Sequence, residues 1–546
     1  MASAVFDLCD RYVTGLAVLD PVWATMRGVA GPPGAGTDYG PDGHAARADL
    51  MRRTLAELAP LPRESAADGA AAAFLAGRLR AELDWHAAGE PLRLLSAPFG
   101  LLATVRDSVE LLGRGGDDPQ PVLARLTAVP AMLAGWRRSL ALGLDRGLPA
   151  ARRQAVEAAD QADRYATGAT HDELVRGYGD GPLAGELAAA ASAAHAGYAD
   201  TARWLREEYA PRAAEADGVG PERHAVARRL VLGADLDPVE SYEWAWAELR
   251  RVEGELATEA DRVRPGASVA EAVALLDGTD VVDGADAYRA WLQEQHDRAI
   301  DRLDGVHFDI APPLRTIDAT LAVGSSSGSA YYTPPDETFT RPGRTWWPLG
   351  GRDRFGVWAE QTTVFHEGVP GHHLQLGLTR VLGDRLSRHQ RVGGVPGHSE
   401  GWALYAERLA DELGWFETPG RRLGMLKASA LRAARVVIDI GLHLDLPLPA
   451  AEAARHGPRW TFEVATEVLR ERGRIAAHRL HPEVVRYCGW PAQATAYKLG
   501  ERAWLAARDE ARARLGAGFD LKRWHTGALA LGPVELAALP AALRTA

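Results

Sequence analysis

Cysteine, lysine and long apolar runs are scarce in this chain of 546 residues, and the shortages of cysteine and of apolar runs each exclude a class of protein. The two cysteines, Cys9 and Cys488, form no Cys-x-x-Cys pair, so we expect neither a disulfide framework nor a cysteine-ligated metal. No run of about eighteen apolar residues occurs, and Met1 is not followed by a secretion signal. We therefore expect a cytoplasmic protein with no membrane partner.

The charge balance excludes a second class of partner. The net charge is −11 and the isoelectric point is near 5.9, whereas a nucleic-acid-binding protein normally presents a basic face. We expect no nucleic-acid partner.

Only three of the 62 basic residues are lysines. Where arginine is the usual cation, a lysine can mark a position that requires a compact ammonium group.

Most of the chain shows the apolar spacing of amphipathic helices. The segments with this pattern are 44–59, 68–88, 121–144, 183–210, 239–263, 285–303, 420–445, 461–479 and 492–514. A chain of this length normally forms more than one compact unit. We predict an N-terminal helical region over 1–310 and a catalytic region over 311–546, packed as one bilobed unit. The oligomeric state stays open between a monomer and a homodimer.

The helical pattern is interrupted between residues 315 and 349. Residues 316–323 alternate between apolar and polar, and 330–332 and 345–347 also have the composition of short strands. The sequence therefore predicts a small sheet before the next helix. Such a sheet has two interpretations: an exposed edge that pairs with an extended substrate backbone, or a structural hairpin that caps the helices.

The segment 366–373 and the later Glu400 carry the strongest functional pattern. The segment reads His-Glu-Gly-Val-Pro-Gly-His-His. A catalytic zinc site needs three protein ligands, an open position for water and a nearby general base. We predict that His366, His372 and Glu400 bind one Zn²⁺ and that Glu367 is the base. Cobalt and manganese are alternative ions.

The spacing of the histidines is unusual for such a site. In an ordinary helix, ligands at positions i and i+4 share a face, but here the second histidine is six or seven residues after His366. Pro370 and Gly371 predict a bulge that absorbs the two extra residues and brings His372 to the metal. His373 is the alternative ligand, on the face that an uninterrupted helix would present. A helix over 355–365 leads into the segment.

A further helix begins near Glu400 in this interpretation and runs to about residue 413, with Glu400 in its first turn. Bundle scaffolds build metal sites from carboxylates and imidazoles on neighbouring helices.

The helix predicted over 420–445 carries three polar residues on one stripe. Arg435, Asp439 and His443 are spaced four residues apart, and the residues around them are apolar. An exposed ladder of ion pairs is one interpretation. The apolar surroundings favour burial, where charges need partners. We predict that Arg435 and Asp439 pair inside the protein and that His443 supports the transition state or a metal ligand.

The two motifs resemble a known family. His-Glu-x-x-Pro-Gly-His-His-x-Gln over 366–375, followed by Glu-Gly-Trp-Ala-x-Tyr-x-Glu over 400–407, resembles the bacterial domain-of-unknown-function family 885 (DUF885), which is similar to gluzincin-type zinc metallopeptidases. Segments with the same likeness are 19–28, 331–335, 341–343, 435–443 and 486–498. The resemblance implies a mainly α, bundle-type metallopeptidase-like fold, similar to thimet oligopeptidase and Taq carboxypeptidase, with a small β-sheet next to the metal-binding helix.

These motifs predict a zinc-dependent hydrolase that cleaves the amide bonds of short peptides as an exopeptidase. Tyr497 and His443 are the candidates for stabilising the oxyanion, beside the base Glu367. Lys498 and Arg435 are candidates for holding a substrate carboxylate.

The candidate substrate-binding residues also include Tyr331 and Tyr332. One alternative keeps the site but changes the substrate to a non-peptide amide or a small-metabolite conjugate. The other is a catalytically silent helical protein that binds metal structurally or not at all.

Overall fold

The computed structural model describes residues 3–113, 118–167, 170–322 and 329–545. Helices make up 71% of it and strands 5%, which confirms the mainly α fold with a small sheet. The chain divides into two compact units. The first comprises residues 1–226, 387–392 and 482–490, and the second comprises 227–386, 393–481 and 491–546. This division differs from the predicted boundary at residue 310, because the helix over 238–263 packs along the helix over 419–444.

The first unit is built almost wholly from helices. Its helices are α1 (Ala4–Leu19), α2 (Pro21–Arg27), α3 (Pro41–Leu58), α4 (Ala66–Ala87), η1 (Glu90–Arg93), α5 (Leu101–Gly113), α6 (Gln120–Asp145), α7 (Arg152–Thr167), α8 (Asp172–Gly177), α9 (Ala184–Trp204), η2 (Leu205–Tyr209), η3 (Ala210–Arg212) and α16 (Arg388–Val392). Two helices, α10 (Gly220–Leu232) and α21 (Ala477–Gly489), contribute residues to both units.

Two apolar clusters hold the first unit together. One fills the space among α5, α6, α7 and α9 and includes the buried side chains of Trp136 and Tyr198. The other lies among α1, α3, α4 and α16 and includes Val13 and Leu75. Burial of side chains like these stabilises a helical unit because each removes apolar surface from water.

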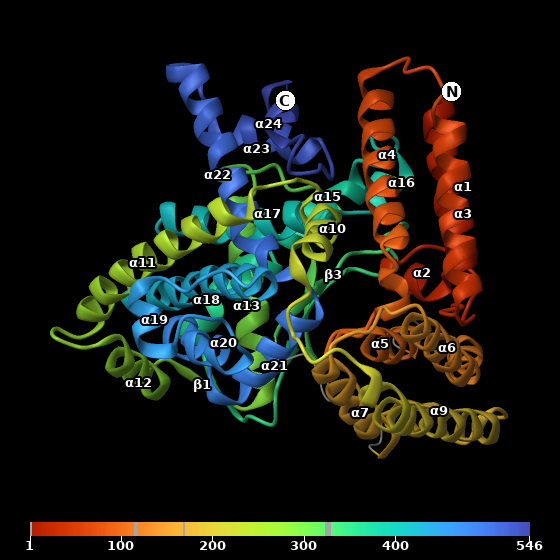
Figure 1. Cartoon of the computed structure of the whole chain (residues 1–546). Helices are drawn as coiled ribbons and strands as arrows, with labels where there is room; N and C mark the ends of the chain where they lie inside the picture. The colour runs from red at the N-terminus through yellow and green to blue at the C-terminus, as the bar shows by residue number, and fades with distance from the viewer. Residues whose placement is uncertain (1–2, 114–117, 168–169, 323–328, 546) are drawn as a thin grey trace. The chain divides into compact units, whose positions relative to one another are not determined.

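The second unit contains the helices and strands around the candidate site (Figure 1). Its helices are α11 (Pro238–Val263), α12 (Val269–Thr279), α13 (Ala285–Leu303), η4 (Pro312–Leu314), α14 (Val357–Glu367), α15 (His372–Val381), η5 (Gly383–Arg385), α17 (Pro396–Glu412), α18 (Pro419–Leu444), α19 (Ala450–His456), α20 (Phe462–Val468), η6 (Leu469–Gly473), η7 (Gln493–Thr495), α22 (Ala496–Leu515), η8 (Gly516–Gly518), α23 (Leu521–Ala530) and α24 (Leu539–Thr545).

Most predicted helices are present within a few residues of their expected ends, but two expectations were wrong. The segment 461–479 is not one helix: α20 continues into the π-helical turn η6, and the chain then breaks at Arg474, whose φ is 52°. Helix α17 begins at Pro396, four residues before Glu400, because proline is well suited to the first helical position. Glu400 therefore lies in the second turn, not the first.

The predicted small sheet is also present. β2 (Ile317–Ala322) pairs in parallel with β4 (Gly343–Pro348), and β3 (Tyr331–Thr333) pairs antiparallel with the other side of β4. Residue 323, the last of the predicted first strand, lies outside the described residues. A second pair joins β1 (Val281–Asp283) to β5 (Arg354–Gly356), from which the chain enters α14 directly. The sheet residues Ala319 and Trp347 pack with Val364 of α14, so the sheet supports the helix that carries His366.

Helices α17 and α22 meet at two glycines. A β-carbon placed on Gly401 would lie 2.4 Å from the carbonyl carbon of Gly500, and one placed on Gly500 would lie 2.1 Å from the carbonyl oxygen of Gly397. These distances are too short for any side chain. The two helices therefore touch through their backbones.

Gly401→Ala should lower the free energy of unfolding by about 1–3 kcal/mol, because the new methyl group must push α22 away. Gly254→Ala is the matched control, since nothing lies within 4 Å of its β-carbon position on α11. That control should be neutral or stabilising by about 0.5–1 kcal/mol, as alanine is the better helix former. Urea unfolding of both variants measures the difference. Equal effects would contradict the backbone contact.

Candidate metal centre

The two histidines of the motif stand on separate helices. His366 lies in the last turn of α14, His372 is the first residue of α15, and the loop 368–371 joins them. The regular hydrogen bonds of a helix are replaced in this loop: the Gly371 N–H donates to the Phe365 carbonyl at 3.0 Å, and the His373 N–H donates to the Gly368 carbonyl at 3.1 Å. The predicted interruption of the helix is therefore confirmed.

Close backbone packing sets the shape of this loop. The Val369–Pro370 peptide bond is cis, and a β-carbon on Gly371 would lie 2.0 Å from the carbonyl oxygen of His366, so only glycine fits. The indole N–H of Trp402, on α17, donates to the Pro370 carbonyl at 2.8 Å. The loop therefore folds back on α14 and is tied to the helix that carries Glu400.

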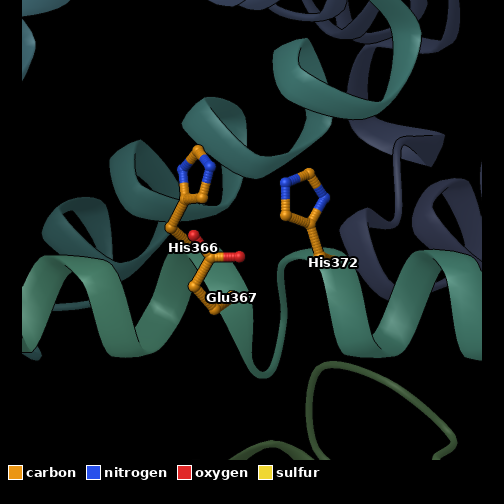
Figure 2. Close-up of side chains that lie close together, drawn as sticks. All are labelled: His366, Glu367 and His372. Atoms are coloured by element: carbon orange, nitrogen blue, oxygen red, sulfur yellow. The ribbon is translucent and has the colours of Figure 1, made fainter. Parts of the chain in front are cut away.

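The consequence is that both imidazoles project to the same side (Figure 2). Their ring centroids lie 4.9 Å apart, with the ring planes nearly perpendicular. Glu400 Oε2 lies 3.4 Å from His366 Nε2 and 3.5 Å from His372 Nε2. One ligand atom each from His366, Glu367 and His372 also falls within 4.8 Å of the others. The structure thus brings together all four residues of the predicted zinc site.

A second carboxylate holds the far side of the His366 ring. Glu407 Oε1, on α17, lies 2.8 Å from His366 Nδ1 and 3.2 Å from Arg432 Nη2. Its other oxygen accepts a hydrogen bond from the Thr362 hydroxyl. Because a carboxylate only accepts, the Nδ1 of His366 carries the proton, and Nε2 is the atom that faces Glu400.

The pKa shifts of His366 and Glu400 have opposite signs, but both favour the charged form of the side chain. Burial lowers the pKa of His366, but Glu400 and Glu407 outweigh it and raise the pKa to about 9. The pKa of Glu400 is held well below its usual range because the imidazoles of His366 and His372 outweigh burial. The two carboxylates therefore favour a positive charge at this point, whether a proton on His366 or a bound cation carries it.

The pKa of Glu367 is raised, in contrast to that of Glu400. The residue is 6% exposed, and burial raises the pKa of its carboxylate, although the neighbouring imidazoles partly oppose the shift. A carboxylate with a raised pKa exchanges protons closer to neutrality than an ordinary glutamate does. This is the property that a general base needs.

The alternative ligand His373 faces away from this group. Its Nε2 donates to the Leu314 carbonyl at 2.9 Å, and its Nδ1 shares a hydrogen bond of 3.0 Å with the Tyr332 hydroxyl. Both ring nitrogens are therefore occupied, and the side chain is fully buried. Of the two histidines, His372 is the one that faces Glu400, while His373 ties α15 to strand β3.

Tyr331 and Tyr332 on β3 have different environments. Tyr332 bonds to His373 and is part of that support, whereas Tyr331 is 38% exposed and stacks on Trp346 with ring centroids 5.8 Å apart. Tyr331 therefore remains the one of the two that a substrate could reach.

Tyr497 lies beside His366. Its ring centroid is 6.5 Å from that of His366, its hydroxyl accepts from Gln493 Nε2 at 3.4 Å, and the Arg435 guanidinium lies 4.9 Å from its ring centroid. The side chain is partly exposed. A cation over the face of a tyrosine ring is an attractive contact, so Arg435 positions the phenol.

The structure gives Lys498 a different environment from the predicted one. Its ammonium is 1% exposed and lies 2.9 Å from Glu248 and 2.5 Å from Glu501. Two carboxylates already satisfy this charge, so it is not available to a substrate carboxylate. We therefore remove Lys498 from the substrate-binding candidates: it joins α22 to α11.

Of Arg435, Asp439 and His443 on α18, not all lie at the candidate centre. The Asp439 carboxylate accepts the Ala492 N–H at 3.0 and 3.2 Å, which fixes the turn before α22. His443 is buried two helical turns beyond Arg435, a displacement of about 12 Å along the axis. Arg435 approaches the candidate centre through Tyr497. The predicted catalytic role of His443 stays a prediction.

Sequence reasoning assigned no role to Glu407, Thr362 or Arg432. A signal for the first was present, because Glu407 follows Glu400 by seven residues and so shares its face of α17. Thr362 likewise precedes His366 by four residues. Nothing in the sequence indicates that Arg432, on α18, meets them.

Comparison with known proteins assigns a family. Residues 21–543 match the family described as "Bacterial protein of unknown function (DUF885)". The chain belongs to this family. A search of the curated proteins finds no match.

Two solved structures share the DUF885 protein's fold. One, described as a "putative lipoprotein" from Colwellia psychrerythraea, has a TM-score of 0.80 at 20% identity and covers 100% of this chain and 99% of its own. The other, of the same description and of unknown function, comes from Shewanella oneidensis, with a TM-score of 0.72 at 17% identity and 99% of both chains covered. No helix within the described ranges is long and apolar enough to cross a membrane.

Glu407→Ala should lower the free energy of unfolding by about 3–5 kcal/mol, because it leaves a buried imidazole and a guanidinium that is only 11% exposed without their carboxylate. The matched control is Glu467→Ala, which breaks an exposed ion pair with Arg470 and should cost less than about 1 kcal/mol. Denaturant unfolding compares the two. A Glu407 variant as stable as the control would show that this network does not support the site.

Proposed function

We propose that this DUF885 protein is a zinc-dependent hydrolase that cleaves amide bonds in short peptides. His366, His372 and Glu400 would hold the ion, and Glu367 would act as the base. The similarity of the motifs to gluzincin-type metallopeptidases points in the same direction.

The observation that carries the proposal is the spacing of the candidate ligand atoms. Glu400 Oε2 is 3.4 and 3.5 Å from the two Nε2 atoms. Ligands at about 2.0–2.2 Å in a tetrahedral zinc site are separated from one another by roughly 3.3–3.5 Å. Glu400 Oε2 is also buried, and no described residue makes a hydrogen bond with it. A buried carboxylate oxygen without a donor fits a position that faces a cation.

A bound zinc ion would supply a water of lowered pKa and polarise the substrate carbonyl. The protein supplies the remaining groups. Glu367 removes the proton of the attacking water and delivers it to the leaving amine. Glu407 keeps the His366 ring in the orientation and tautomer that a ligand needs. The Tyr497 hydroxyl is the donor for the oxygen of the former carbonyl, where negative charge develops.

The preference for exopeptidase action now rests on Arg435 alone, since Lys498 is neutralised. A panel of dipeptides, longer peptides, N-acyl amino acids, and formyl and carbamoyl compounds separates peptide hydrolysis from hydrolysis of a non-peptide amide. Hydrolysis of free dipeptides with loss of activity on C-terminally amidated ones would support carboxylate recognition. The position of Glu367 beside the ligand His366 argues against a catalytically silent metal site, which needs no base beside its ligands.

The cytoplasmic location also stays a prediction. Fractionation of the cells that make the protein tests it, and both similar structures come from proteins described as lipoproteins.

Glu367→Gln should reduce kcat by a factor on the order of 10² to 10⁴, because the amide cannot transfer the proton. The zinc content should equal that of the wild type, since this residue is not assigned as a ligand. Activity on the best substrate of the panel, together with elemental analysis after dialysis, measures both quantities. A variant that loses zinc as well as activity would overturn the assignment of Glu367 as the base.

Glu400→Ala should remove one zinc ion per chain and weaken its binding by more than the roughly 10- to 100-fold that loss of a supporting residue costs. The circular dichroism spectrum should not change, because Glu400 is partly exposed at 20%. Glu467→Ala again serves as the control and should retain all of its zinc. Unchanged zinc affinity in the Glu400 variant would exclude this carboxylate as a ligand.

A further inference from the structure

A second group of metal-ligating side chains lies outside the centre described above. Glu452 and His456 are one turn apart on α19, so they share a face of that helix. Glu471 comes from η6, the π-helical turn that follows α20. Such turns alter the direction of the side chains that they carry, and they are frequent at functional sites. None of the three residues belongs to α14, α15 or α17.

The three side chains converge on one point. His456 Nε2 lies 3.7 Å from Glu452 Oε2 and 3.5 Å from Glu471 Oε2. One ligand atom from each residue falls within 4.8 Å of the other two. These separations are a few tenths of an ångström longer than the edges of a four-coordinate zinc site and fit an ion with slightly longer bonds to oxygen.

In both Glu452 and Glu471, one carboxylate oxygen contacts an arginine and the other faces His456. Glu471 Oε1 lies 2.6 Å from Arg455 Nη2, and Glu452 Oε1 accepts a hydrogen bond from Arg472. The second oxygen of each, Oε2, is the one that faces His456. This is the arrangement expected of carboxylate ligands, whose outer oxygen is fixed by a hydrogen bond while the inner one faces the metal.

The inner atoms have no hydrogen bonds among the described residues. Glu452 is 4% exposed, and its Oε2 is buried without a donor; Arg455 Nη1 lies 3.7 Å from it, beyond hydrogen-bond distance. His456 Nε2 and Glu471 Oε2 are likewise buried without a hydrogen bond. Leaving three such atoms together is unfavourable unless something occupies the point on which they converge.

The surrounding charge permits a cation. Arg472 also pairs with Glu253 of α11 at 3.0 Å, so three carboxylates face the two guanidiniums of Arg455 and Arg472. With a neutral imidazole, the group carries one net negative charge, which attracts a cation. The competing arrangement is an imidazolium on His456 that bridges the two carboxylates.

We propose that Glu452, His456 and Glu471 bind a divalent transition-metal ion at a second centre that links α19 to η6. One imidazole nitrogen and two carboxylate oxygens suit Zn²⁺ or Mn²⁺ better than a softer ion. Three protein ligands leave room for water. The centre is separate from the proposed catalytic one and does not depend on the hydrolase proposal.

The test uses the full chain with the first centre removed by His366→Ala and Glu400→Ala. After chelation and dialysis, this chain is titrated with Zn²⁺, and separately with Mn²⁺, by calorimetry. We expect about one ion of either metal per chain. His456→Gln or Glu471→Gln, added to the same background, should weaken binding at least tenfold. His478→Ala, which removes an exposed histidine from the same unit, should leave binding unchanged.

A chain without the first centre that binds neither ion would overturn the proposal, as would binding that both glutamine variants leave intact. Either result would favour the imidazolium bridge. Circular dichroism shows whether each variant is folded. If His456→Gln is not, Glu471→Gln decides, because its side chain is 31% exposed and can be replaced at less risk to the fold. Binding also should raise the Tm of the chain that lacks the first centre and not that of its Glu471→Gln variant.

Discussion

One hydrogen bond, from the Trp402 indole to the Pro370 carbonyl, determines how three helices meet at the candidate centre. The loop 368–371 lies between α14 and α15, and Trp402 lies half a turn from Glu400 on α17. Because the indole is fully buried, the bond is shielded from competing water. It fixes the loop to the helix that supplies the carboxylate. The separation of His366, His372 and Glu400 therefore depends on a contact made by none of them.

Helix positions were predictable because they follow from local patterns of apolar residues. The errors came where the backbone departs from the regular helical period. The π-helical turn η6 adds a residue to one turn, and the spacing of the apolar residues does not predict it. The early start of α17 was visible in Pro396, which is suited to a first turn, but the predicted helix began only near Glu400. The unit boundary depends on which helices pack together, and a local pattern cannot show that.

The candidate centre was predictable where residues that can bind a metal lie within a few positions of one another in the sequence. His366, Glu367 and His372 are neighbours in sequence, and the proline and glycine between them indicated the interruption that brings them together. Lys498 was misjudged because a rare residue type shows that a position is special, not which partner it has. Its two carboxylates come from Glu501, one turn away, and from Glu248, 250 residues earlier in the chain. Partners at that distance cannot be inferred from one sequence.

The contact between Gly401 and Gly500 has a consequence for motion near the centre. Glu400 precedes the first of these glycines by one residue, and Tyr497 precedes the second by three. Two backbones in van der Waals contact have no rotamers to exchange, so thermal fluctuations cannot slide one helix toward the other. The Glu400 carboxylate and the Tyr497 phenol are thus held next to a rigid contact between α17 and α22. Any opening that admits a substrate must come from the other walls, whose side chains can turn.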